Sequence, residues 1–422
     1  MMRFNLLKSL ISWLIWPLKK LYMLLSHKRV EEFALRPMVL PAKIISVGNI
    51  SFGGTGKTPT VIWIAKQIQR LNPKMNVGVH LRGYTGLMEN TGGIVSDGKH
   101  IFAGPVEAGD EAYLAAKELL KAGIPVGVGK HKAETGLALI KRFSLDALVM
   151  DDAFQFTSLK RDLDIVLIDA TRPFGEAGFP REGVMREPLN AIERADVVIL
   201  TRTDLMGGGV LRGIIDRFKP FLKPGTHVFL SSFIPKAIRA VNSNTEADAD
   251  LLSRRKAVPM SAIGNPRGFE RMLEKMGMQL LKPLRFPDHH KFTRKDIDYI
   301  NKQVTDQGGH VIFTTEKDMV RLGHLAVEIE APIYTIPIKF ELKGEGEFLS
   351  ILNKAVSSGM LVKHHAEVHK LAEETRVFAV KKDYERIAEG RTSTKPPTPK
   401  PKPAKVAENS EAATDPDWWK AI

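Results

Sequence analysis

A glycine-rich turn near residue 50 carries the residue types that bind nucleotide phosphates. It reads Gly53-Gly54-Thr55-Gly56-Lys57-Thr58, follows the apolar run 43–48 and precedes a segment whose apolar residues share one helical face. Glycines let backbone N–H groups approach phosphate oxygens, a lysine reaches the β and γ oxygens, and a threonine hydroxyl binds Mg²⁺. Ser51 stands where the usual pattern has its first glycine, so an ordinary glycine-rich turn is the alternative. We predict that this turn binds a nucleotide.

Two carboxylates follow another apolar run. Asp151 and Asp152 come directly after residues 147–150, at the expected end of a strand. In a protein with a phosphate-binding loop, an aspartate at such a strand end holds Mg²⁺ directly or through water. The alternative is an aspartate that caps a helix or stabilises a turn. We predict that Thr58, Asp151 and Asp152 bind the metal.

Three other polar positions have the types needed for catalysis. Asp110 opens the predicted helix 111–121 and is either a functional carboxylate or a helix cap. Arg82 follows an apolar run and either clamps a phosphate or pairs with a surface acid. Adjacent histidines at 289 and 290 would face opposite ways in a strand, which disfavours metal binding by both. A single catalytic or substrate-positioning histidine competes there with a structural one.

The elements that must position these residues alternate between strand and helix. Apolar runs recur at 43–48, 77–81, 124–128, 146–150, 164–168 and 196–201, with helical stretches between several of them. This alternation predicts an α/β fold with a mostly parallel sheet covered by helices on both faces, of the P-loop NTPase type. Ligands of such folds bind beyond the carboxyl ends of the strands. We expect a core at 31–224 and a smaller α/β lobe at 225–358, with a cleft between them.

Composition narrows the function further. The chain has 422 residues and a formal net charge of +14, and it contains no cysteine. The missing cysteines exclude disulfides, a thiol nucleophile and a thiolate metal site, and they fit a reducing compartment. The positive charge favours an anionic partner such as a nucleic acid, a phosphorylated substrate or a membrane surface. Aromatic-interleaved basic patches are not evident, so we predict no nucleic acid partner.

The two ends of the chain differ from the middle. Residues 1–30 carry six basic side chains and no acidic one, arranged as a narrow cationic stripe beside a wide apolar face with tryptophans. That pattern predicts a helix lying in a membrane interface, with a helix packed on the protein core or a transmembrane anchor as alternatives. Residues 359–389 read as a charged helix and 390–422 as a disordered basic tail rich in Pro and Lys. Trp418 and Trp419 near its end could touch a membrane or a partner.

Eight motifs occur in an order that resembles one family. They are VGNISFGGTGKTP (47–59), RGY (82–84), GDE (109–111), DDAFQ (151–155), FGEAGFPREGVMREP (174–188), IGNPRGF (263–269), FPDHH (286–290) and TTEKD (314–318). Together they look like the tetraacyldisaccharide 4′-kinases, the lipid A 4′-kinases of Gram-negative bacteria. The resemblance covers about residues 5–345. Ala153, Phe156 and Lys132 depart from the family pattern, which usually has Gly, His and Arg at these positions.

The resemblance implies a reaction and roles for single residues. The enzyme would use ATP and Mg²⁺ to phosphorylate the 4′-hydroxyl of an acylated glucosamine disaccharide 1-phosphate. It would work as a peripheral protein at the cytoplasmic face of the inner membrane. Lys57 would be catalytic as well as nucleotide-binding, and Asp110 would pair with His289 as the base. Arg82 and Gln155 would contact the substrate or its phosphate.

Two other classes of function compete with this interpretation. A membrane-associated nucleotide switch would read guanine through an Asn-Lys-x-Asp sequence, but residues 201–204 read Thr-Arg-Thr-Asp and lack the Asn and Lys. A non-enzymatic basic binding protein would use its charged ends, would not need Lys57, and would lose affinity steeply with salt. Nucleotide competition and a Lys57→Ala variant distinguish these classes from a kinase.

Overall fold

The computed structural model describes residues 37–174, 185–241, 243 and 245–358. The predicted interfacial helix at 1–30, the charged segment at 359–389 and the tail with Trp418 and Trp419 lie outside the described residues. No helix within the described ranges is long and apolar enough to cross a bilayer.

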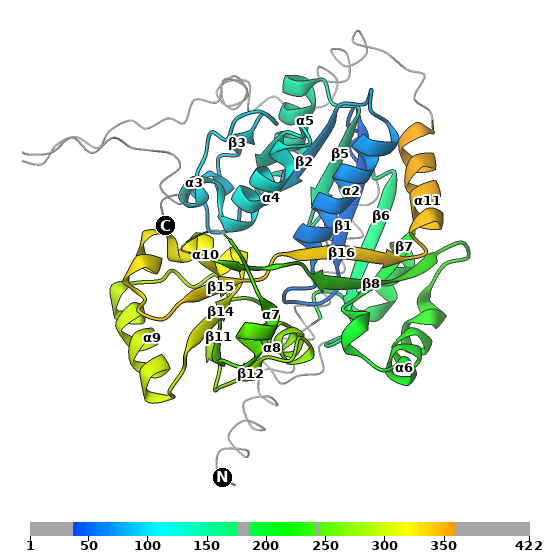
Figure 1. Ribbon diagram of the computed structural model, residues 1–422. Coiled ribbons are helices and arrows are strands. Elements are labelled where there is room, and N and C mark those ends of the chain that lie inside the picture. The colour runs from blue at the N-terminus through cyan, green and yellow to red at the C-terminus, as the bar shows by residue number, and fades with distance from the viewer. Residues whose placement is uncertain (1–36, 175–184, 242, 244, 359–422) are drawn as a thin grey trace, which may run out of the picture.

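A sheet of nine strands forms the larger lobe (Figure 1). Its order is β16-β8-β7-β6-β1-β5-β2-β4-β3, and every pairing from β8 to β4 is parallel. The strands are β1 (Lys43–Asn49), β2 (Val77–Leu81), β3 (Gly93–Ser96), β4 (Val126–Val128), β5 (Ala147–Asp151), β6 (Leu163–Asp169), β7 (Val197–Thr201), β8 (His227–Pro235) and β16 (Ile338–Lys343). All six apolar runs of the sequence are strands of this sheet, which confirms the predicted mostly parallel α/β fold.

Helices cover both faces of this sheet, because its central strands are apolar on both sides. On β6, Ile165 and Leu167 pack into one core while Val166 and Ile168 pack into another. Such double burial is typical of parallel strands between two helical layers. The helices are α2 (Lys57–Leu71), α3 (Pro105–Ala108), α4 (Asp110–Leu120), α5 (Lys132–Phe143), α6 (Gly208–Phe218) and α11 (Glu345–Ser357). Short 3₁₀ helices are η1 (Leu87–Glu89), η2 (Leu189–Arg194), η3 (Thr203–Leu205) and η4 (Lys219–Phe221).

The smaller lobe has its own sheet and its own apolar cores. Strands β11, β14 and β15 are parallel at its centre, and β9 joins antiparallel at one side. The strands are β9 (Ile238–Ala240), β10 (Glu246–Ala247), β11 (Lys256–Ser261), β12 (Gln279–Leu280), β13 (Leu284–Arg285), β14 (Val311–Thr314) and β15 (Ile333–Thr335). The helices are α7 (Ala249–Ser253), α8 (Pro266–Lys275), α9 (Arg294–Asp306), α10 (Glu316–Leu322) and the 3₁₀ helix η5 (Gly323–Glu328).

Two neighbouring strands join the lobes. The chain leaves the larger sheet at the end of β8 and returns at the start of β16, and these strands are paired antiparallel with Pro235 opposite Ile338. The Lys236 N–H donates to Pro337 O at 2.8 Å beside this crossing. Strand pairing therefore puts β8 and β16 with the larger lobe, and α11 packs there against α2. The predicted boundaries at 225 and 358 stay a prediction.

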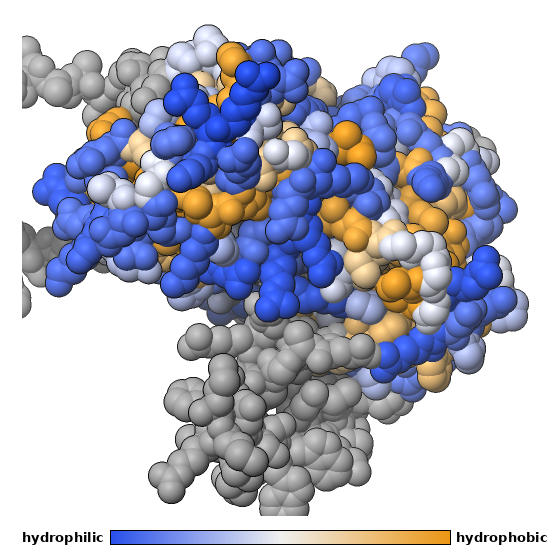
Figure 2. All heavy atoms as spheres, turned by 60° about the horizontal axis from the view of Figure 1, so that its bottom comes forward, coloured by the Kyte–Doolittle hydropathy of each residue, from blue (hydrophilic) through white to orange (hydrophobic). Residues whose placement is uncertain are grey.

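The surface on the side of the smaller lobe is mostly polar. Figure 2 views the molecule from that side, where apolar side chains are exposed in several separate areas between charged residues. Exposed large apolar residues of the elements on this side include Val210 on α6 and Leu251 on α7. Scattered exposed apolar residues are ordinary for a folded protein.

Candidate active site

The glycine-rich turn lies between β1 and α2, and side chains at the ends of β7 and β1 hold its backbone by hydrogen bonds. Thr201 Oγ1 donates to Thr55 O at 2.9 Å, and Asn49 Nδ2 donates to Ser51 O at 2.7 Å. Gly56 has a φ of 90°, and a Cβ at this position would lie 2.2 Å from Phe233 Cζ. Only glycine combines that backbone conformation with so close a contact. These contacts fix the backbone of the turn at the carboxyl end of β1, while its binding of a nucleotide stays a prediction.

Lys57 begins α2 and points into a small cage of polar groups. Its Nζ lies 3.4 Å from Asp152 Oδ1 and 3.4 Å from Asn49 Oδ1. Arg186 also contacts Asp152, with NH1 2.6 Å from Oδ1. Burial would raise the pKa of Asp152, but the positive charges of Lys57, Arg186 and Lys132 outweigh it and hold the pKa well below its usual range. Asp152 therefore already has cationic side-chain partners.

Asp151 has a different environment. The Thr58 hydroxyl lies 3.5 Å from Asp151 Oδ2 and 3.3 Å from Glu111 Oε2. Asp151 Oδ1 is buried and has no hydrogen-bond partner within the described residues. Burial, opposed by Lys57 but reinforced by Glu111 and Asp152, raises the pKa of Asp151 to about 7.

These features fit a magnesium ion. A divalent cation would satisfy the unpartnered Asp151 oxygen and favour the ionised carboxylate. Among the residues that the structure describes, no group of three or more His, Cys, Asp or Glu side chains could hold a metal alone. Mg²⁺ commonly takes only one or two protein ligands and completes its shell with water and phosphate oxygens. Thr58 and Asp151 are the ligands that this geometry favours.

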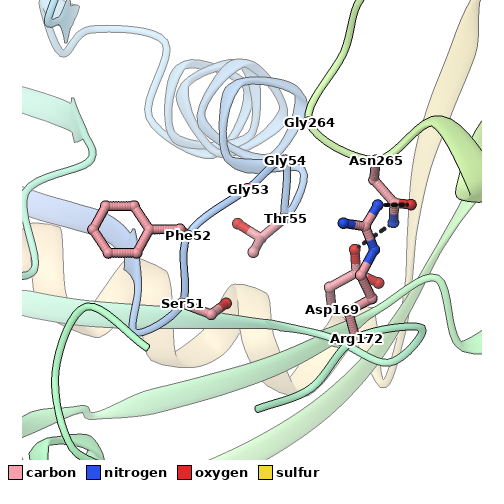
Figure 3. Close-up of a pocket in the computed structure, with 9 residues that line it drawn as sticks. All are labelled: Ser51, Phe52, Gly53, Gly54, Thr55, Asp169, Arg172, Gly264 and Asn265. Atoms are coloured by element: carbon pink, nitrogen blue, oxygen red, sulfur yellow. Dashed lines mark hydrogen bonds between the residues drawn. The ribbon is translucent and has the colours of Figure 1, made fainter. Parts of the chain in front are cut away.

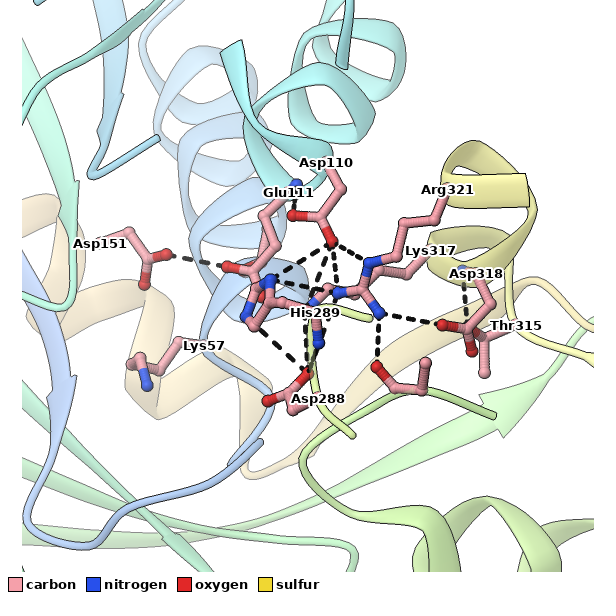
Figure 4. A network of polar contacts seen from close by, with 12 residues as sticks. Lys57, Asp110, Glu111, Asp151, Asp288, His289, Thr315, Lys317, Asp318 and Arg321 are labelled. Carbon is pink, nitrogen blue, oxygen red and sulfur yellow. Dashed lines mark hydrogen bonds and ion pairs between the residues drawn. The ribbon is translucent and has the colours of Figure 1, made fainter. Parts of the chain in front are cut away.

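Asp110 and His289 come together from different lobes (Figure 4). Asp110 starts α4 in the larger lobe, and His289 follows β13 in the smaller one. His289 Nδ1 lies 3.5 Å from Asp110 Oδ2, and Asp110 Oδ1 accepts from the Glu111 N–H at 2.8 Å. The Tyr84 ring meets the His289 ring edge-on with centroids 4.7 Å apart. The Asp110–His289 pair expected from the resemblance is therefore close, although 3.5 Å is long for a hydrogen bond.

Two basic residues of α10 complete this cluster. Lys317 Nζ donates to Glu111 Oε1 at 2.6 Å, and Arg321 Nε donates to Asp110 Oδ2 at 2.6 Å. Burial would raise the pKa of Asp110, but contact with His289 and the charges of Lys317 and Arg321 hold it well below its usual range. The carboxylate is therefore kept ionised.

A pocket lies on the other side of the glycine-rich turn, between the two lobes (Figure 3). It is lined by Ser51, Phe52, Gly53, Gly54, Thr55, Asp169, Arg172, Gly264 and Asn265. Asn265 caps α8 by accepting from Gly268 N at 2.9 Å, and its Nδ2 donates to Asp169 Oδ2 at 2.8 Å. A Cβ on Gly264 would lie 2.5 Å from Gly54 N. The smaller lobe thus rests directly on the glycine-rich turn.

The other predicted residues have partners of their own. Arg82 Nε pairs with Glu89 Oε1 at 2.7 Å, the surface pairing that was the alternative for this residue. Gln155 Nε2 donates to Asn49 O at 2.8 Å, behind the turn. Lys132 is buried and donates to Asp151 O at 2.7 Å. Ala153 is buried and Phe156 packs against a neighbouring core. Gln155 and Lys132 therefore support the turn from its surroundings. Arg82 is two residues from Tyr84, which contacts His289, so it remains close to the site.

Sequence reasoning missed several residues of this site. Glu111, Lys317, Arg321 and Asn265 all contact predicted site residues or line the pocket, but the sequence alone gave none of them a role. Lys317 belongs to the TTEKD motif and Asn265 to IGNPRGF, so the sequence identified both motifs but not the role of either residue. The spacing of Lys317 and Arg321, one helical turn apart, was the available signal of a basic helix face.

Comparisons with known proteins agree on one family. The family profile described as tetraacyldisaccharide-1-P 4′-kinase matches residues 11–357. A tetraacyldisaccharide 4′-kinase of Halothermothrix orenii is 32% identical over 374 residues, which cover 83% of this chain and 96% of that protein. One of Desulfatibacillum aliphaticivorans is 35% identical over 344 residues, covering 80% and 90%.

A solved structure gives the same result. The crystal structure of LpxK from Aquifex aeolicus in complex with ATP superposes with a TM-score of 0.60 and 26% sequence identity. The match covers 82% of this chain and 99% of that one.

Proposed function

The chain belongs to the tetraacyldisaccharide-1-phosphate 4′-kinase family, and from this premise we propose how its residues carry out the reaction. It is an ATP-dependent kinase of lipid A biosynthesis that transfers the γ-phosphate to the 4′-hydroxyl of an acylated glucosamine disaccharide 1-phosphate. One observation carries the assignment of the site. The Thr58–Glu111–Lys317 contacts connect the glycine-rich turn to the Asp110–His289 pair, so an unbroken chain of polar contacts joins the two halves of the site.

The nucleotide half is the turn at 53–58. Its backbone N–H groups and the α2 N-terminus would bind the phosphates of ATP, and Lys57 would stabilise the charge on the transferred phosphoryl group. Thr58 and Asp151 would hold Mg²⁺, which when bound neutralises the β and γ oxygens. Asp152 would serve chiefly to position Lys57, because it contacts Lys57 and Arg186.

The acceptor half is the Asp110–His289 pair. A sugar hydroxyl is a weak nucleophile, and in-line attack requires a group that orients it and receives its proton. An ionised, buried Asp110 is suited to accept that hydrogen bond, with His289 beside it. Tyr84 contacts His289, so a substrate entering past Tyr84 reaches this pair.

A lipid substrate requires contact with a membrane, and we propose that the edge of the cleft makes it at the cytoplasmic face of the inner membrane. Tyr84, Leu87, Phe102 and Val106, here called the acceptor rim, are large apolar residues that are 47–70% exposed. Leu87 lies on η1, which packs against α3 with Val106. Tyr84 of this rim contacts His289, and exposed apolar side chains suit a substrate whose acyl chains remain in the bilayer. The formal charge of +14 favours an anionic surface.

Phosphate transfer from γ-³²P ATP to the disaccharide 1-phosphate lipid in detergent micelles tests the assignment. Lys57→Ala, Asp110→Ala and His289→Ala should each lower the rate by about 10²–10⁴-fold, the range for lost charge stabilisation or general-base groups. Replacement of the exposed Lys219 by Ala is the matched control and should leave the rate unchanged. A folded Asp110→Ala variant with the wild-type rate would exclude Asp110 as the base.

A further inference from the structure

Arg321 contacts both members of the acceptor pair, although it is neither of them. Its side chain is only 7% exposed and comes from α10 of the smaller lobe. Its Nε and NH2 both contact Asp110 Oδ2, with Nε at 2.6 Å. NH2 also lies 3.2 Å from His289 Nδ1, closer than the 3.5 Å between that nitrogen and Asp110. The two catalytic groups are thus bridged by a guanidinium (Figure 4).

The bridge fixes which atoms remain available. A guanidinium has only donors, so the contacts of Arg321 take up acceptor positions on Asp110 Oδ2. Asp110 Oδ2 is occupied by Arg321, whereas Asp110 Oδ1 accepts only the Glu111 N–H among the described residues. A carboxylate oxygen accepts two hydrogen bonds, so Oδ1 retains one lone pair.

Arg321 is itself held in one orientation. Its NH1 donates to Asp318 Oδ1 at 3.0 Å and to Ala262 O at the end of β11. Lys317, one turn earlier on the same helix face, contacts Glu111 at 2.6 Å and is 3.9 Å from Asp110 Oδ2. Each acid at the start of α4 therefore has its own cation from α10, and Arg321 is the partner of Asp110.

We propose that Arg321 is a positioning residue that makes Asp110 Oδ1 the atom that receives the proton of the acceptor hydroxyl. The inference rests on the base role proposed above for the Asp110–His289 pair. As the bond between the sugar oxygen and the γ-phosphorus forms and the bond to the ADP oxygen breaks, the hydroxyl proton passes to Oδ1. His289 Nδ1 faces the same Oδ2 atom as Arg321, so His289 helps to orient the carboxylate.

The pH dependence of kcat is the readout that a merely structural role would not move. The titratable and charged groups around Asp110 are Lys317 and Arg321 from α10, His289 from the loop after β13, Glu111 from α4, and Asp288, which faces Arg321. Removing the guanidinium charge raises the pKa of Asp110, so the fall of kcat at low pH must begin at a higher pH.

The experiment compares three variants with the full-length wild type from about pH 9 down to about pH 4, close to the usual pKa of an aspartate carboxyl. Arg321→Gln should lower kcat by about 10²-fold, the cost of a misplaced catalytic group, with the KM for ATP nearly unchanged. Its acidic limb should move to higher pH. Arg321→Lys keeps the charge and should recover most of kcat and the wild-type limb. Arg294→Gln, which removes an exposed ion pair to Glu328 in the same lobe, is the control and should change neither.

A double variant separates this inference from the proposed function. In an Asp110→Asn background, Arg321→Gln should lower kcat by less than about twofold, because residues that act as one unit are not additive. Arg321→Gln could lower kcat equally in both backgrounds, or leave the acidic limb of the pH profile in place. Either result would overturn the inference and leave Arg321 with only a structural role in holding the two lobes together. If Arg321→Gln does not fold, Arg321→Lys takes its place, and a loss that persists fully in Asp110→Asn would overturn the inference in the same way. An Asp110→Asn variant with wild-type kcat refutes the base role itself.

Discussion

The two ends of the cleft are built in opposite ways. The nucleotide end is centred on one continuous run, residues 53–58, which is held by the ends of β1 and β7 in the larger lobe and touched by Gly264 of the smaller lobe. The acceptor end is assembled from both lobes, and its central contact joins Asp110 to Arg321 across 211 positions of sequence. A site made from one run can be read from a motif, whereas a site made from several segments needs the topology.

The ends also differ in how their charges are matched. At the nucleotide end, a buried Asp151 oxygen has no partner in the part of the chain that the structure describes. At the acceptor end, Asp110 and Glu111 each have a cation from α10. At the nucleotide end, a bound ligand would therefore supply the missing partner of the buried carboxylate. At the acceptor end, side chains of the other lobe already supply the partners of both carboxylates.

The largest expected effect tests whether a bound cation is the missing partner of Asp151 at the nucleotide end. Asp151→Asn should lower kcat by about 10²–10³-fold, because it removes a carboxylate expected to hold the ion that balances the phosphate charge. Raising Mg²⁺ should recover part of the rate. Asp146→Asn, at the opposite end of the same strand segment, should behave as wild type. An Asp151→Asn enzyme with unchanged Mg²⁺ dependence would contradict the metal assignment.

The next effect tests the contact between the lobes at the nucleotide end. In Gly264→Ala the new Cβ would lie 2.5 Å from Gly54 N, so the glycine-rich turn must shift. Overpacking of this kind costs about 1–3 kcal/mol. We expect about 1.4 kcal/mol of this cost to fall on nucleotide binding, which raises the KM for ATP about tenfold. Gly213→Ala on α6 has open space around the new Cβ and is the control. Equal ATP affinity in both variants would show that this contact is not maintained in the working enzyme.

A smaller effect should come from Asn265. Asn265→Ala removes the cap of α8 and the hydrogen bond to Asp169, and should lower the free energy of unfolding by about 2 kcal/mol. The KM for ATP should rise a few-fold as well, because Asp169 lines the same pocket. Asn301→Ala breaks hydrogen bonds to Glu328 and Glu330 inside the smaller lobe. Asn301→Ala should lower the free energy of unfolding and leave the KM for ATP unchanged. An equal rise in the KM for ATP in both variants would mean that reduced stability of the smaller lobe, and not the Asn265 contact, raises the KM.

The smallest effect concerns the acceptor rim. Leu87→Asp with Phe102→Asp should reduce binding to phosphatidylglycerol-containing vesicles about fivefold, from the partial burial of two apolar side chains. The rate on a short-chain substrate dispersed without vesicles should be unchanged. Val210→Asp on α6 is the control for a charge placed at an exposed apolar position. Vesicle binding that falls equally in both would assign the effect to charge and not to the rim.

The strands and helices of the larger lobe could be predicted well from the sequence, because their apolar residues recur at regular spacings. Strands such as β5 and β6 are short apolar runs with a functional group at the carboxyl end, and Asp151 was found by that rule. The same rule applied to β6 points to Asp169, which was overlooked. Arg321 could not be found this way because its importance depends on α10 packing against α4 from another lobe. Local patterns record burial and backbone geometry, and they do not record which distant charges meet.

The crossing of β8 and β16 has a consequence for engineering. Because Pro235 and Ile338 are paired neighbours on antiparallel strands, a tight hairpin turn could close the larger sheet and omit everything between them. The shortened chain would keep the glycine-rich turn, Lys57 and Asp151 but lose His289, Lys317 and Arg321. Nucleotide binding and phosphate transfer would then be carried by separable parts of one polypeptide.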